Sequence, residues 1–193
     1  QYDVQVAFIQ SVIDPTHPPV YCDPAEGYED RRHYVYQLHK HLYGMKDSPR
    51  GWSKLFTSVC LKYGFSQLKS DECVFVKIVP NTKSGKSVNT FSAVLDTLPN
   101  VPEHDRIYKY CPYERCLIIL CSYVDDILAF TNCQSLADDF LAHCNKRFTM
   151  TCDGEAHWYL SVKYTRDPSG AVSASQELYI DKILKRWGME SCK

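Results

Sequence analysis

The stretch CLIILCSYVDDILAFT, residues 116–131, holds two apolar runs of strand length with adjacent carboxylates between them. Leu117–Tyr123 forms the first run and Ile127–Thr131 forms the second. Because only Val124-Asp125-Asp126 separate the runs, the pattern predicts a tight antiparallel hairpin that carries both acids at its tip.

Two adjacent acids at such a tip repel each other unless a cation lies nearby. Mg²⁺ prefers carboxylate oxygens, so the pair Asp125-Asp126 is a candidate metal site. A solvated polar turn is the alternative interpretation. Asp3 lies in an apolar segment, where a lone acid is poorly placed without a partner. A fold that brings Asp3 beside the hairpin tip would form a three-carboxylate cluster suited to two-metal phosphoryl transfer.

Helix and strand signals surround the hairpin. Residues 1–9 are rich in Val, Phe and Ile and predict a strand. Ser48-Pro49 is a helix start, with Ser48 as the N-cap, and Gly64 is the matching stop after apolar residues at helical spacing. A second helix is predicted over 135–148.

The remaining signals are turns and a final helix. Segments 157–166 and 171–175 flank an Asp-Pro-Ser-Gly turn at 167–170 and predict another hairpin. The last helix is predicted over 176–187. Residues 80–113 are rich in Ser, Asn, Thr and Pro with no sustained period, which indicates a loop or insertion.

The composition is that of a globular chain. Among 193 residues, 22 Lys and Arg oppose 23 Asp and Glu, and 45% are hydrophobic, which excludes a disordered chain. No apolar run approaches the roughly 18 residues that span a bilayer, and no signal peptide is seen, so a soluble, cytoplasmic protein without membrane partners is expected. The ten cysteines are scattered, which favours buried reduced thiols over a disulfide framework or a zinc site.

One stretch departs from this neutrality. Residues 31–69 hold eight Lys or Arg and a single acid, Asp47. The imbalance fits a polyanion-binding face, and it fits a solvated helix surface equally well.

The ordered motifs resemble those of reverse transcriptases. Tyr123-Val124-Asp125-Asp126 resembles their catalytic hairpin, and residues 1–8 resemble their first carboxylate motif. Further segments resemble copia-type long-terminal-repeat retrotransposons: Val20-Tyr21, residues 24–28, 42–46, Pro49-Arg50 with Trp52, Ser70-Asp71, residues 75–77, 157–160, Ser175-Gln176, Tyr179-Ile180 and 188–193.

The resemblance implies an α+β reverse-transcriptase palm in which helices back an antiparallel sheet. Palm would cover residues 1–156, and a primer-grip-like hairpin with the start of the thumb would cover 157–193. Most of the fingers would be missing. The implied activity is RNA-directed DNA polymerisation within a Pol polyprotein that also contains fingers, integrase and ribonuclease H, in retrotransposon virus-like particles. Its partners would be an RNA or DNA template with primer and a dNTP.

The resemblance also assigns residues. Asp3 and Asp125 would bind two Mg²⁺ ions, which Mn²⁺ can replace, with Asp126 completing the acidic cluster and the Val4 carbonyl assisting. Phe8, Gly44 and Lys46 would contact the nucleotide, with Phe8 excluding a 2′-hydroxyl. Contacts with nucleic acid would come from Arg50, Trp158, Tyr159 and Ser161. From the residues alone, Phe8, Trp158 and Tyr159 are equally consistent with core positions. Lys46 and Arg50 are equally consistent with a solvated surface.

Several positions depart from the family pattern. Gln10-Ser11 replaces Asn-Gly, and Ser161 replaces a glycine of the primer-holding hairpin. Because the sequence starts two residues before Asp3, weak or no activity is expected of this fragment alone. A decayed or domesticated, catalytically silent protein that binds nucleic acid or protein is the alternative. A two-metal nucleotide cyclase is a more remote one.

Overall fold

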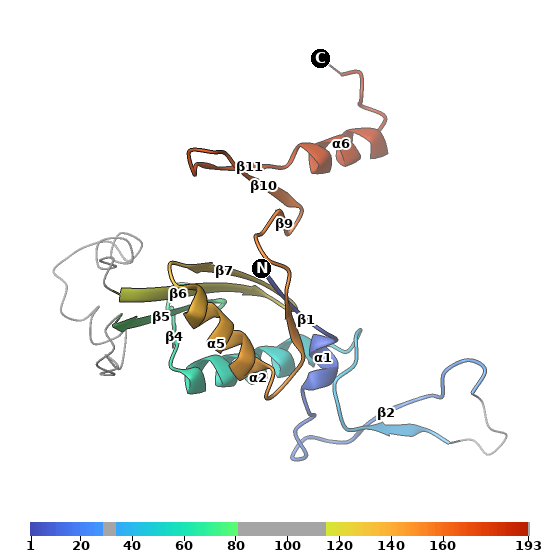
Figure 1. The fold of residues 1–193 in the computed structure, drawn as a ribbon. Coiled ribbons are helices and arrows are strands. Elements are labelled where there is room, and N and C mark those ends of the chain that lie inside the picture. Colours follow the sequence, from blue (N-terminus) through green and yellow to red (C-terminus); the bar gives the residue numbers. More distant parts are fainter. Residues whose placement is uncertain (29–33, 81–114, 193) are drawn as a thin grey trace.

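The computed structural model describes residues 1–28, 34–80 and 115–192. Their largest unit is a six-stranded antiparallel sheet with the order β4-β5-β6-β7-β1-β8 (Figure 1). The predicted loop over 80–113 lies outside the described residues, apart from Pro80 at the end of β5. The strands of the sheet are β1 (Tyr2–Val4), β4 (Ser66–Gln67), β5 (Val74–Pro80), β6 (Arg115–Tyr123), β7 (Asp126–Thr131) and β8 (Met150–Cys152).

The predicted hairpin over residues 116–131 is confirmed. β6 and β7 pair from Ile118 with Thr131 to Tyr123 with Asp126, so Val124-Asp125 form a two-residue turn. Asp126 belongs to β7 rather than to the turn. Ile118 and Leu120 lie two residues apart on β6, so their side chains point to the same face of the sheet. Both are fully buried there.

Two helices, α2 (Ser48–Tyr63) and α5 (Gln134–Cys144), cover that face of the sheet (Figure 1). Aromatic rings join them: Tyr63 of α2 lies 5.4 Å from Phe140 of α5, centroid to centroid. The C-terminal end of α2 matches the prediction, since Gly64 closes it with a positive φ of 95°, and the helix begins one residue earlier than predicted. Its N-cap is Asp47 instead of Ser48, and the buried Ser48 hydroxyl donates to the Leu42 carbonyl at 2.5 Å.

The first strand is shorter than predicted. β1 ends at Val4, because Val6 adopts a left-handed conformation (φ 48°, ψ 51°) that turns the chain into the one-turn helix α1 (Ala7–Gln10). The predicted strand over 1–9 is therefore wrong after Val4. As a result Phe8 lies on a helical turn.

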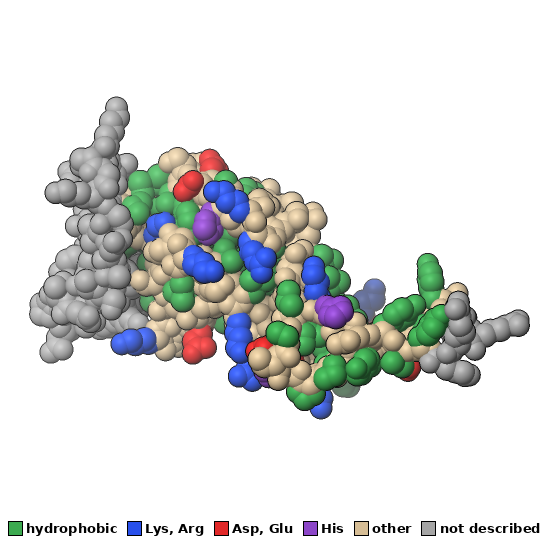
Figure 2. Space-filling model, turned by 90° about the horizontal axis from the view of Figure 1, so that it is seen from below, with side chains coloured by type: hydrophobic (Ala, Val, Ile, Leu, Met, Phe, Trp, Pro, Cys, Tyr) green, Lys and Arg blue, Asp and Glu red, His purple; other side chains and the backbone are tan. Residues whose placement is uncertain are grey.

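Between α1 and α2 the chain forms a two-stranded hairpin of β2 (Val20–Cys22) and β3 (Tyr36–Leu38) that extends away from the sheet (Figure 1). Figure 2 shows hydrophobic side chains along this projection. Its exposed large apolar residues are Tyr21, Tyr28, Tyr34, Val35 and Tyr36.

The C-terminal segment forms a separate three-stranded sheet and a helix (Figure 1). β10 (Val162–Arg166) and β11 (Val172–Ser175) make the predicted hairpin, and β9 (Trp158–Tyr159) pairs with β10 through a second turn. α6 (Glu177–Arg186) follows. No described residue after Met150 is buried.

Each helix in the described ranges is too short or too polar to cross a bilayer. No disulfide joins the cysteines in those ranges, and only Cys60, Cys116 and Cys144 of them are buried. Cys111 lies outside them.

Candidate active site

Two strands bring the predicted carboxylates together. β1 pairs antiparallel with β7, and Asp3 lies directly opposite Asp126. Directly opposed residues of antiparallel strands point to the same face, so these two carboxylates share one side of the sheet. Asp125 precedes Asp126 in the hairpin turn. All three acids are partly buried.

Unusual backbone geometry fixes the hairpin tip. Val124 has φ 56°, a conformation that a β-branched residue rarely adopts and that costs on the order of 1–3 kcal/mol. The Trp52 indole of α2 donates to the Val124 carbonyl at 2.6 Å, and the Val4 amide donates to the Asp125 carbonyl at 3.0 Å. The core helix and β1 therefore both hold the turn that carries Asp125.

The electrostatics of the cluster show charge repulsion. Burial and the nearby charges of Asp125, Asp153 and Asp126 raise the pKa of Asp3. Burial, Asp125 and Asp153 likewise raise the pKa of Asp126, against a hydrogen bond with Gln1 that lowers it. The cluster thus accumulates negative charge that a bound cation would offset.

Asp153 is a fourth acid that the sequence analysis missed. It follows β8, which pairs with β1, and its amide donates to the Gln1 carbonyl at 2.9 Å. In the sequence, Asp153 is marked only by its position one residue after a strand. That position does not show that the strand pairs with β1, which carries Asp3.

The donor chemistry fits a hard divalent cation, since carboxylate oxygens are the ligands that Mg²⁺ prefers. In the described part of the chain, however, no three His, Cys, Asp or Glu side chains are arranged to hold a metal ion. Val4 is 1% exposed and lies opposite Met150. Its carbonyl as a metal ligand stays a prediction.

An aromatic pair borders the acids. The rings of Phe8 and Tyr43 lie 4.7 Å apart, and Phe8 also packs against the core. Burial and the charge of Asp125 raise the pKa of Tyr43, while a hydrogen bond with the Ala7 backbone lowers it. Phe8 therefore packs against the core and also contacts Tyr43, whose pKa is raised by the charge of Asp125.

Other predicted contact residues are placed less directly. Gly44 has φ 93° and open space around it, so its glycine serves the turn conformation. Lys46 is exposed, and no described contact joins it to the acids. Arg50 lines a different pocket, whose lining includes none of the three acids.

The predicted primer-grip residues lie on the β9–β10 hairpin. Tyr159 donates its hydroxyl to the Cys121 carbonyl of β6 at 3.1 Å, and burial with nearby Cys121 and Asp126 raises its pKa to about 12. Trp158 and Ser161 are exposed. None of the three is buried, so the alternative that they are ordinary core residues is wrong.

Comparison with known proteins identifies relatives. Residues 1–88 match the reverse transcriptase (RNA-dependent DNA polymerase) family. The whole chain is 29% identical to the retrovirus-related Pol polyprotein from transposon TNT 1-94 of Nicotiana tabacum and 29% identical to that from transposon RE1 of Arabidopsis thaliana. A putative transposon Ty5-1 protein of Saccharomyces cerevisiae is 21% identical over 93% of the chain and 47% of its own length.

The chain spans only 12% and 11% of the two plant polyproteins. No solved structure matches it significantly. These relatives give no support to the alternative of a silent remnant. Residues 1–88 are thus similar to the reverse transcriptase family, and the whole chain is similar to transposon Pol polyproteins, as its resemblance to copia-type retrotransposons predicted.

Proposed function

We propose that residues 1–156 are the palm of an RNA-directed DNA polymerase and that residues 157–193 are its primer-grip hairpin and the start of its thumb. The observation that supports this is the position of Asp3 opposite Asp126, with Asp125 in the adjoining turn. The reaction is transfer of a nucleotide from a dNTP to a primer 3′-hydroxyl on an RNA or DNA template.

Asp3, Asp125 and Asp126 hold the catalytic Mg²⁺ or Mn²⁺ ions in this proposal, with help from the Val4 carbonyl. When bound, such ions lower the pKa of the attacking hydroxyl and offset charge on the triphosphate. The mutual repulsion that raises the pKa of Asp3 and Asp126 supports a cation site there.

The neighbouring residues position the substrates. Phe8, backed by the Tyr43 ring, lies under the incoming sugar and excludes a 2′-hydroxyl. Gly44 and Lys46 contact the nucleotide, and Arg50 contacts nucleic-acid phosphates. Trp158, Tyr159 and Ser161 hold the primer end, and the Tyr159–Cys121 hydrogen bond ties that hairpin to the strand preceding the acids.

The chain acts with the other parts of a Pol polyprotein in this proposal, because its relatives are such polyproteins and it matches a small share of them. Fingers, integrase and ribonuclease H are the expected partners. The site of action is a virus-like particle.

Primer extension by the polyprotein that contains this chain tests the proposal. Asp125→Asn is expected to lower the rate about 100-fold or more, because bound metal contributes several kcal/mol and each 1.4 kcal/mol is tenfold. Asp138→Asn is the matched control, since Asp138 is an exposed acid on α5 that accepts a hydrogen bond from Gln134. Unchanged extension by Asp125→Asn contradicts the site, and an inactive wild type with intact flanking domains favours the silent alternative.

A further inference from the structure

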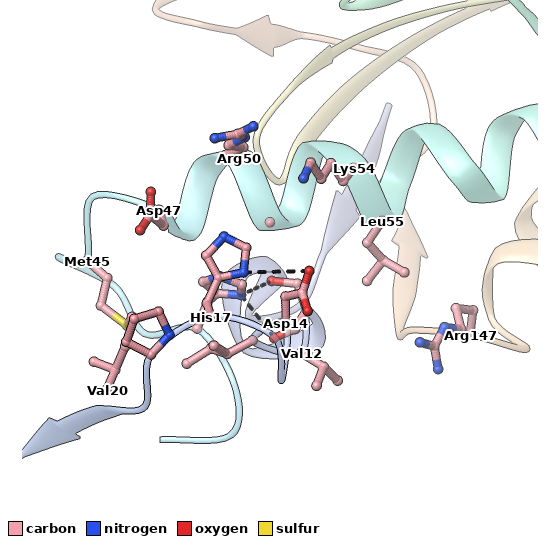
Figure 3. A pocket seen from close by; sticks show the side chains of 15 residues that line it. Val12, Asp14, His17, Val20, Met45, Asp47, Arg50, Lys54, Leu55 and Arg147 are labelled. Carbon is pink, nitrogen blue, oxygen red and sulfur yellow. Dashed lines mark hydrogen bonds and ion pairs between the residues drawn. The ribbon is translucent and has the colours of Figure 1, made fainter. Parts of the chain in front are cut away.

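A pocket of about 490 Å³ lies beside the N-terminal half of α2. Its walls are the segment after α1, the stretch before α2, one side of α2 and Arg147 after α5 (Figure 3). None of Asp3, Asp125 and Asp126 lines it. The volume lies within the range of small-molecule sites in proteins.

Three cations line the pocket without a fixed partner. Within the described ranges, the side chains of Arg50, Lys54 and Arg147 make no hydrogen bond and no ion pair. Figure 3 shows Asp47 and Met45 at one end of the pocket and Leu55 and Arg147 at the other. The end of the pocket opposite Asp47 is therefore positively charged and can attract an anion.

The other carboxylate of the pocket is already engaged. Asp14 accepts hydrogen bonds from the Thr16 amide at 2.9 Å and the Thr16 hydroxyl at 2.7 Å, and lies 3.6 Å from His17. These Thr16 bonds, followed by the charges of His17 and Lys54, lower the pKa of Asp14. Asp14 thus stays charged but is balanced by its own neighbours.

A buried histidine gives the pocket a defined polar wall. His41 is 7% exposed, and its Nδ1 lies 3.0 Å from the Ser11 hydroxyl and 3.3 Å from the Ser11 carbonyl oxygen. Because that carbonyl only accepts and the Ser11 hydroxyl donates to Phe8, Nδ1 carries the proton. In this tautomer the remaining nitrogen, Nε2, carries no proton and can accept a hydrogen bond.

Nε2 of His41 is accessible from the pocket. It has no hydrogen-bond partner in the described part of the chain, where every fully buried side-chain nitrogen or oxygen does have one. Gly51 makes room for the ring, since a Cβ at position 51 would lie 2.4 Å from His41 Cε1. Glycine inside a helix costs about 1 kcal/mol relative to alanine, so α2 is locally weakened where it seats His41.

We propose that this pocket is a second phosphate-binding site, separate from the acidic cluster, for the phosphate of a free nucleotide or of a nucleic-acid strand. Lys54 and Arg147 contact the phosphate oxygens, and His41 Nε2 accepts a hydrogen bond from a ligand hydroxyl. The inference does not rest on catalysis by Asp3, Asp125 and Asp126.

Titration of the 193-residue chain with deoxyadenosine monophosphate and with a short oligothymidylate, both in EDTA at physiological ionic strength, tests the site. EDTA keeps metal ions from the acidic cluster, so failure here is distinct from failure of the polymerase proposal. The double variant Lys54→Gln, Arg147→Gln is expected to bind about tenfold or more weakly, because charged hydrogen bonds contribute about 1.5–3 kcal/mol each.

Lys62→Gln, Lys146→Gln is the matched control, since it removes the same charge from exposed cations of the same two regions outside the pocket. Tighter binding of the monophosphate identifies a nucleotide site, and tighter binding of the oligothymidylate identifies a strand site. Binding of neither probe, or an equal loss in the control variant, overturns the proposal.

Discussion

The sheet with its two helices and the segment from β9 to α6 are stabilised in different ways. The buried apolar residues all lie between Tyr2 and Met150 within the described ranges. The C-terminal segment instead relies on local hydrogen bonds, such as those that the Asp167 carboxylate accepts from Ser169 and Ala171. Its side-chain tie to the sheet is the Tyr159–Cys121 hydrogen bond.

This difference bears on function. The three acids lie on strands and a turn that the buried core fixes, whereas the predicted primer-grip residues lie on a hairpin with little packing of its own. The acidic cluster is therefore preorganised by the core, while the hairpin is held to the sheet by few contacts.

Removal of a core ring should give the largest effect. Phe140 is fully buried and lies 5.1 Å from Phe65 and 5.4 Å from Tyr63, centroid to centroid. Phe140→Ala is expected to lower the free energy of unfolding by about 3–5 kcal/mol through lost burial and a cavity. Trp187→Ala, after α6, should change it by less than about 0.5 kcal/mol, because Trp187 is 70% exposed. Urea unfolding followed by circular dichroism measures both, and similar losses would contradict the contrast.

A smaller effect is expected at Gly51. Alanine normally stabilises a helix interior by about 1 kcal/mol relative to glycine. Here Gly51→Ala should destabilise the sheet unit by about 1–3 kcal/mol, because its Cβ overlaps the His41 ring.

The same substitution in a His41→Ala background should become neutral or stabilising, and a double-mutant cycle in thermal or urea unfolding reports the coupling. Equal effects of Gly51→Ala in both backgrounds would show that the ring is not the cause.

The local features of the fold were predictable from sequence. α2 ends where Gly64 predicts and begins one residue before the start predicted from Ser48-Pro49, and the β6–β7 hairpin follows from two apolar runs around a short turn. Each of these signals lies within a few residues of the structure it determines. The strand predicted over 1–9 failed at Val6, because one left-handed residue reverses the chain and the composition contains no sign of it.

The site depends on long-range pairing, which composition does not determine. Asp3 faces Asp126 because β1 inserts between β7 and β8, and only the family resemblance made that arrangement predictable. Asp153 and the Ser11–His41 pair were missed for the same reason: each joins segments that are far apart in the sequence.

Removal of a carboxylate should stabilise the sheet at the acidic cluster but destabilise the turn between β10 and β11. The raised pKa of Asp3 means that its stabilising contribution is present below the unfolded pKa near 4 and is lost as the pH rises through the folded pKa. In EDTA at pH 7, Asp3→Asn should therefore raise the melting temperature, because it removes one of the mutually repelling carboxylates.

Asp167 has a lowered pKa, from hydrogen bonds with Ser169 first, so its contribution is present above the unfolded pKa and is lost as the pH falls. Asp167→Ala should loosen the β10–β11 turn at neutral pH, seen as faster amide exchange at Ala171. Melting curves from pH 3 to pH 7 test Asp3, and a lower melting temperature for Asp3→Asn at pH 7 would show that the acids do not repel.

The smallest effect is expected at the turn between β9 and β10. Leu160 and Ser161 have φ of 49° and 67°, although two-residue hairpin turns of this kind favour Asn-Gly. Ser161→Gly should stabilise the hairpin by about 0.5–1 kcal/mol, since a left-handed conformation costs a non-glycine residue about 1–2 kcal/mol and glycine adds some unfolded-state entropy.

Because little packing joins this hairpin to the sheet, the gain should appear as slower amide exchange at Val162 with no change in the urea midpoint of the sheet. Ser169→Gly is the control in the neighbouring turn, where the serine hydroxyl donates to Asp167 at 2.6 Å and its removal should speed exchange. If Ser161→Gly raises the urea midpoint instead, the hairpin unfolds together with the sheet, and the two regions form one cooperative unit.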